Sequence, residues 1–134
     1  MRGRAAWWAD LGRVSPCGKL ADTIASSVED YPSFANFGGD EGDRYEEDIY
    51  VGYRYFETFA PAREKVLYPF GFGLSYTSFA MQWDMAEEED GCAFRVKVKN
   101  TGAYAGKEVV QVYAEAPQGV LGKPLRVLAA FAKT

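Results

Sequence analysis

The 134-residue sequence contains no histidine. Ser-His and Cys-His nucleophile pairs and histidine metal sites are therefore excluded, because each of them needs an imidazole. There are two cysteines, Cys17 and Cys92, and their wide separation matches no recognised metal-binding or redox spacing. Both are expected to be free, mostly buried thiols.

Positive charge is also scarce, with 15 Lys and Arg against 19 Asp and Glu and a net charge of −4. Nucleic acids and anionic membrane surfaces attract basic patches, so neither is an expected partner. No apolar run approaches the roughly 18 residues that would cross a bilayer. Asp10 interrupts the apolar stretch that follows the basic N-terminus, so no signal peptide is expected. A cytoplasmic location is favoured on that ground, although a longer parent chain would leave it undetermined.

Aromatic residues, in contrast, are abundant at 16% of the chain. Such an excess marks either rings that stack on sugars or rings that pack between domains, and packing is the favoured interpretation. The rings concerned lie in the middle of the chain: Tyr50, Tyr53, Tyr55, Phe56, Tyr68, Phe70, Phe72 and Tyr76.

The first half of the chain has weak patterns. Residues 4–11 are rich in Ala, Leu and Trp and are followed by Gly12, which predicts a short helix. Residues 18–25 alternate weakly, which predicts a short strand. A long polar loop is expected over 26–47, held down by three rings, and a short helix is expected to begin near Val51. The three rings are Tyr31, Phe34 and Phe37.

Residues 68–77 read YPFGFGLSYT and favour neither a helix nor an ordinary strand. Gly71 and Gly73 permit backbone angles that a side chain would forbid, while Pro69 fixes its own φ and biases Tyr68 towards an extended conformation. This pattern predicts a rigid aromatic linker between two domains.

The second half alternates regularly between apolar and polar residues. Residues 79–85 and 92–98 are predicted to be two half-buried antiparallel strands, joined by a charged connection over 87–91. A third strand is predicted over 108–114 and a fourth from residue 125. Strands at this spacing indicate a β-sandwich, but the chain supplies only about half of the roughly 100 residues that a seven-stranded sandwich needs.

One cluster of carboxylates could in principle do acid–base chemistry or bind calcium. No nearby apolar segment would separate the pKa values of its members, and its spacing lacks the regular ligands of a calcium loop, so a solvated acidic loop is expected. No carboxylate pair with the geometry of a retaining glycosidase can be assigned. We therefore assign no catalytic, metal or cofactor-binding residue, and the substrate-binding residues stay unknown. The cluster consists of Asp40, Glu41, Asp43, Glu46, Glu47 and Asp48.

Four motifs carry a family resemblance. They are SPCGKLADT at 15–23, EDIYVGYRYF at 47–56, YPFGFGLSYT at 68–77 and NTGAYAGKEVVQVY at 100–113. In this order the chain resembles the C-terminal part of glycoside hydrolase family 3 enzymes of the bacterial β-glucosidase type. The resemblance covers nearly the whole chain, except that Trp7 and Trp8 stand where the family has small and aliphatic residues.

The resemblance implies a fold, a domain division and a role. Residues 1–77 would be the end of an α/β sandwich domain with the aromatic linker, and 78–134 the first part of a fibronectin type III-like domain. The implied fold class is mixed and mainly β, with an incomplete antiparallel sandwich after a short helix, a short strand and aromatic-anchored loops. The family hydrolyses O-glycosyl bonds of β-linked sugars with retention, using a barrel aspartate and an upstream glutamate. Neither has a counterpart here.

Three interpretations follow. The chain is a non-catalytic portion of such an enzyme, partnered by its barrel and α/β sandwich domains. Alternatively, it is a separate carbohydrate-binding or protein-interaction module, with its rings exposed as a platform. As a third option, it does not fold stably alone, because half a sandwich leaves apolar strand residues uncovered.

Overall fold

The computed structural model describes residues 11–39, 42 and 46–134. The chain divides into two compact units, and the predicted helix over 4–11, with Trp7 and Trp8, falls almost entirely outside the described residues. Unit 1 comprises Met1–Gly18, Gly73–Val110 and Phe131–Thr134, and unit 2 comprises Lys19–Phe72 and Gln111–Ala130.

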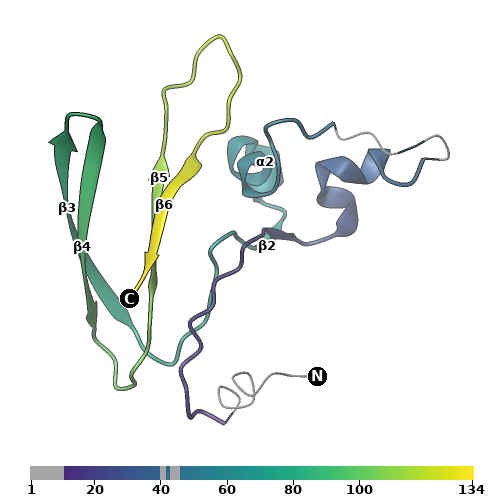
Figure 1. Cartoon of the computed structure of the whole chain (residues 1–134). Coiled ribbons are helices and arrows are strands. Elements are labelled where there is room, and N and C mark those ends of the chain that lie inside the picture. The colour runs from purple at the N-terminus through teal and green to yellow at the C-terminus, as the bar shows by residue number, and fades with distance from the viewer. Residues whose placement is uncertain (1–10, 40–41, 43–45) are drawn as a thin grey trace. The chain divides into compact units, whose positions relative to one another are not determined.

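The predicted hairpin is confirmed in unit 1. Strand β3 (Phe79–Glu88) pairs antiparallel with β4 (Gly91–Asn100) over its whole length, and Figure 1 shows the two arrows joined by a tight turn. The apolar residues of both strands share one face, because Trp83 is opposite Val96 and Met85 is opposite Phe94 in this register.

The prediction that these strands are half-buried is wrong for their largest side chains. Trp83 is 70% exposed, and Met81, Met85 and Phe94 are also exposed. Alternation places the apolar residues on one face, but a two-stranded sheet buries that face only where another layer covers it. Cys92 lies in the same hairpin and is an exposed free thiol, which corrects the expectation that both cysteines are mostly buried.

The third and fourth predicted strands are also present. They are β5 (Val109–Ala114) and β6 (Val127–Lys133), which pair in a separate two-stranded sheet. Each strand has residues in both units. The described residues therefore make antiparallel strand pairs with a few short helices, and the mixed, mainly β fold class with an incomplete sandwich is confirmed.

The strand predicted over 18–25 is shorter than expected. Only β1 (Ile24–Ala25) is a strand, and it pairs irregularly with β2 (Val66–Tyr68), which the sequence patterns did not predict. Just before β1, the Thr23 amide donates to the Asp22 side chain at 2.7 Å, so this amide does not form a hydrogen bond between strands. Leu20 nevertheless exchanges backbone hydrogen bonds with the aromatic segment, donating to Phe72 and accepting from Gly71, each at 2.8 Å.

The loop predicted over 26–47 contains two 3₁₀ helices, η1 (Val28–Asp30) and η2 (Pro32–Asn36). Of the three rings expected to hold this loop down, Tyr31 does so. Its hydroxyl donates to the Thr23 carbonyl at 3.0 Å and accepts from the Ala25 amide at 2.9 Å. Phe34 and Phe37 are exposed, so the expectation that they also hold the loop down is wrong.

The short helix predicted near Val51 is confirmed as α2 (Tyr53–Thr58), which a second helix, α3 (Ala60–Arg63), follows directly. Gly52 precedes α2 at a φ of 58°, a conformation that glycine adopts without strain. Phe56 of α2 is 1% exposed. It forms the buried hydrophobic cluster of the described residues with Ala25 and Ala62. This small core lies in unit 2 and fixes α2 against β1.

Candidate functional site

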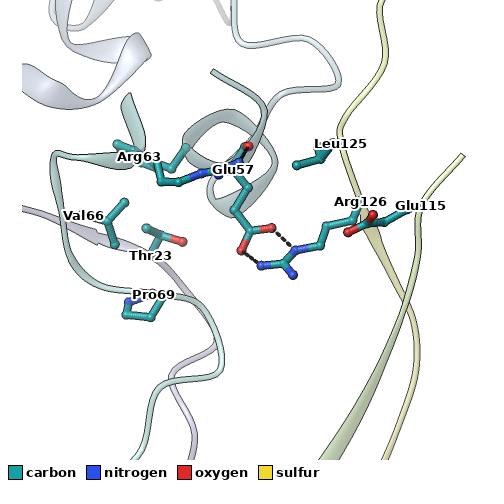
Figure 2. Close-up of a pocket in the computed structure, with 9 residues that line it drawn as sticks. Thr23, Glu57, Arg63, Val66, Pro69, Glu115, Leu125 and Arg126 are labelled. Carbon is teal, nitrogen blue, oxygen red and sulfur yellow. Dashed lines mark hydrogen bonds and ion pairs between the residues drawn. The ribbon is translucent and has the colours of Figure 1, made fainter. Parts of the chain in front are cut away.

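One face of α2 holds the segment 111–130 through three side chains, Tyr53, Glu57 and Thr58, which we call the α2 clamp. Glu57 accepts two hydrogen bonds from the Arg126 guanidinium, at 2.5 Å from Nε and 2.7 Å from the terminal nitrogen, as the dashed lines in Figure 2 show. Positions 53 and 57 are four residues apart and therefore lie on the same side of a helix.

The other two clamp residues accept backbone hydrogen bonds. The Leu125 amide donates to Thr58 Oγ1 at 2.9 Å, and the Leu128 amide donates to the Tyr53 hydroxyl at 2.8 Å. Thr58 Oγ1 itself donates to the Arg54 carbonyl at 2.5 Å, within the helix. The clamp thus satisfies backbone groups at two positions of the opposing segment and adds one charged pair.

Two groups beside the clamp, Arg126 and Tyr113, have raised pKa values. The hydrogen bond to Glu57 raises the pKa of the Arg126 guanidinium, so this side chain stays protonated. Its carbon atom Cζ lies 5.1 Å from the centre of the Tyr113 ring, in cation–π range. Burial, supported by the charge of Glu57, raises the pKa of the Tyr113 hydroxyl. Tyr113 is therefore neutral beside the ion pair.

The rings that could have stacked on sugars pack largely on one another. Tyr53 lies 4.6 Å from Phe70 and 6.1 Å from Tyr113, measured between ring centroids. Tyr68 lies 4.9 Å from Phe72 in the same way. Phe56, one of the eight rings, is buried, which removes it from any exposed platform. Ring edges and faces that meet each other at these distances contribute packing energy within unit 2.

Two of the three remaining rings, Tyr50 and Tyr55, also pack on other rings. Tyr50 lies 5.1 Å from Phe59, and Tyr55 lies 5.3 Å from Phe56. Tyr76 is half exposed and lies in unit 1, where its amide donates to Ser15 Oγ at 3.1 Å. Sequence reasoning found these rings, but their partners at Phe59 and Tyr113 could be found only from the fold.

The motifs of the sequence meet in both units. In unit 2, Gly71 has a φ of 78°, and a side chain there would collide with Gln111 of the motif 100–113. In unit 1, the hydroxyls of Ser15 and Ser75 lie 2.8 Å apart, and the Asn100 side chain accepts from Thr77 Oγ1 at 2.6 Å. Motifs that are far apart in the chain are therefore neighbours in space.

A cavity of about 550 Å³ lies in unit 2, beside the clamp. This volume is within the range of about 300–1,000 Å³ that small-molecule sites occupy. Its lining mixes four charged side chains with apolar ones (Figure 2), and sequence patterns gave no sign of it. The lining residues are Thr23, Phe56, Glu57, Arg63, Val66, Pro69, Glu115, Leu125 and Arg126.

Thr23 is the unusual member of this lining. The residue is 1% exposed, and its Oγ1 has no hydrogen-bond partner among the residues that the structure describes. Figure 2 shows the oxygen directed towards the Glu57 and Arg126 side of the cavity. A buried hydroxyl without a partner costs about 1–3 kcal/mol, and such groups are rare in folded proteins.

The acidic cluster lies partly outside the described residues, which exclude Asp40, Glu41 and Asp43. Glu46 and Asp48 are exposed. Within the described ranges, no group of three or more Cys, Asp or Glu side chains is arranged to hold a metal ion. No helix among the described residues is long and apolar enough to cross a membrane.

No protein-family model matches the chain. Individual proteins do match. The chain is 57% identical over 124 residues to a β-glucosidase of Ruminococcus albus, covering 92% of the chain and 13% of that protein. The solved structure of a β-glucosidase from Paenibacillus barengoltzii superposes with a TM-score of 0.90 at 60% identity, covering 97% of the chain and 14% of that structure. The solved structure of a family 3 β-glucosidase from Bifidobacterium adolescentis superposes with a TM-score of 0.84 at 40% identity. This match covers 95% of the chain and 19% of that structure.

By sequence and by fold, the chain therefore matches part of a class of glycoside hydrolases. More narrowly, it matches the small C-terminal region of the β-glucosidases of glycoside hydrolase family 3. It spans less than a fifth of the length of these relatives, at 13% to 19%.

Proposed function

We propose that the chain serves as the non-catalytic C-terminal portion of a retaining β-glucosidase that hydrolyses O-glycosyl bonds. The observation that carries this proposal is the match of almost the whole chain to a small part of much longer β-glucosidases. The family resemblance places the nucleophile in a barrel and the acid/base upstream of residues 18–20. We accordingly assign no catalytic residue to this chain and expect no hydrolysis from it alone.

The role we assign to the chain is domain packing. We take residues 1–77 as the end of the α/β sandwich domain and 78–134 as the first part of the fibronectin type III-like domain. On this division the α2 clamp joins the two domains, because Glu57 is on one side and Arg126 on the other. The contacts of Tyr53 with Phe70 and Tyr113 support the same role for the aromatic segment.

The proposed partner is the remainder of such an enzyme, namely its barrel and α/β sandwich domains. The exposed apolar face of the β3–β4 hairpin supports the need for a covering layer, since Trp83 and Phe94 are both exposed on it. The alternative of an exposed ring platform for carbohydrate has less support, because the rings of unit 2 pack on one another.

A chimera tests the proposal. The corresponding region of the Paenibacillus barengoltzii β-glucosidase is replaced by this chain, and hydrolysis of an aryl β-glucoside is measured. We expect the chimera to keep its activity within about tenfold, and a deletion of the region to lose it. The isolated chain serves as the second control. Hydrolysis by the isolated chain, after rigorous removal of contaminating enzyme, would contradict the non-catalytic assignment, and an inactive but folded chimera would contradict the packing role.

A further inference from the structure

The cavity beside the α2 clamp has the chemistry of a ligand site, in addition to the packing contact that Glu57 and Arg126 make with each other. Its charged lining is balanced, with the carboxylates of Glu57 and Glu115 against the guanidinium groups of Arg63 and Arg126. The side chains present therefore give neither an anion nor a cation a net electrostatic advantage.

The same side chains keep spare hydrogen-bonding capacity. A carboxylate has about four acceptor sites and a guanidinium has five N–H donors, whereas the Glu57–Arg126 pair uses two of each. Arg63 donates to the Glu57 carbonyl at 2.5 Å and likewise retains further donors. Donors and acceptors set side by side match hydroxyl groups, each of which both donates and accepts.

Thr23 Oγ1 adds an independent observation. It is buried, has no hydrogen-bond partner within the described part of the chain, and is directed into this cavity. A hydroxyl of a ligand could donate to it or accept from it and so provide the missing hydrogen bond. Val66, Pro69 and Leu125 supply an apolar wall, against which the C–H groups of a ring can lie.

We propose that this cavity binds a neutral polyhydroxy compound the size of a monosaccharide, hydrogen-bonded to Thr23 Oγ1 and to the Glu57–Arg126 pair. Binding at this cavity does not depend on the proposed function. A hydroxyl-rich segment of another protein would offer similar groups, but it would need to enter a cavity of about 550 Å³, which suits a small molecule.

The test titrates the full 134-residue chain with D-glucose and myo-inositol, and separately with inorganic phosphate and methylammonium as charged comparators. Methyl resonances of Thr23, Val66 and Leu125 are followed by NMR. We expect saturable shifts with at least one neutral polyol and weaker or no shifts with the charged probes. Thr23→Val should weaken polyol binding at least tenfold, whereas Thr23→Ser, which keeps the hydroxyl, should stay within about threefold. Thr101→Val, in unit 1, should leave binding unchanged.

Three binding results would overturn the proposal: tighter binding of phosphate or methylammonium than of either polyol, equal polyol affinity in the wild type and Thr23→Val, or no saturation by either polyol. The folding of Thr23→Val is checked without ligand. Because the variant removes a buried hydroxyl that lacks a partner, we expect its urea midpoint to be equal or higher than that of the wild type. A lower midpoint would indicate that the hydroxyl is already satisfied within the protein, which also contradicts the proposal.

Discussion

The ion pair between Glu57 and Arg126 should stabilise unit 2 more than an ordinary surface salt bridge does. Its geometry is bidentate at 2.5 and 2.7 Å, and the Glu57 side chain is only 18% exposed, although Arg126 is 40% exposed. Exposed pairs contribute about 0.2–1 kcal/mol, whereas breaking a fully buried pair costs about 3–5 kcal/mol. Since water still reaches Arg126 and screens the pair, we expect a coupling energy of about 1–2 kcal/mol.

A double-mutant cycle measures this energy. The variants are Glu57→Gln, Arg126→Met and the double substitution, and the free energy of unfolding comes from urea titrations followed by circular dichroism. The pair of Lys65 and Asp30 is the matched control, because it has a single contact at 2.8 Å and Lys65 is 53% exposed. Its cycle should give a smaller coupling energy than the Glu57–Arg126 cycle, because water screens the exposed ammonium group.

Amide exchange gives a second, local measurement of the same effect. Glu57→Gln should raise the exchange rates of the Leu125 and Leu128 amides by about tenfold, since both donate to other clamp residues and about 1.4 kcal/mol corresponds to a factor of ten. A coupling energy below about 0.3 kcal/mol, or one no larger than that of the Lys65 control, would refute the argument that partial burial strengthens this pair.

Three further predictions concern the core, the aromatic segment and alkaline pH. Gly71→Ala should lower the free energy of unfolding by about 1–2 kcal/mol, because φ is 78° and a Cβ would meet Gln111, whereas Gly119→Ala, with open space around it, should change it little in the same urea titration. Phe56→Ala should abolish cooperative unfolding by heat, since the loss of a buried ring costs about 3–5 kcal/mol and this ring dominates the small core; a two-state transition with an unchanged midpoint would contradict that. The pKa of Tyr113 is raised in the folded state, so the neutral hydroxyl contributes to the stability of the folded protein. This contribution is fully present below the unfolded pKa of about 10 and is lost as the pH rises through the folded pKa. Unfolding titrations above pH 10 should therefore show a shallower loss of stability in Tyr113→Phe, and identical slopes would count against the shift.

The second half of the fold could be predicted because its patterns are local. In residues 79–100, period-two alternation and a charged turn lead to one register, in which Trp83 is opposite Val96. The same alternation could not reveal that Trp83 is exposed, because burial depends on a covering layer and not on the strand's own sequence. The patterns of the first half did not predict β2 for a similar reason, since β2 is a strand only through its pairing with β1.

By itself, the sequence determined which chemistry the chain lacks, which strands form the hairpin, and which family the four motifs indicate. The absence of histidine and the alternation of side chains are properties of residue types and spacing, so they do not depend on how the chain folds. The tertiary structure alone decided that Glu57 binds Arg126 and that Thr23 lies buried at the edge of a cavity. It also decided that the Gln111 side chain occupies the space beside Gly71 where a Cβ would lie. These contacts join residues far apart in the chain, and no local pattern encodes which distant side chains a folded backbone brings within hydrogen-bonding distance.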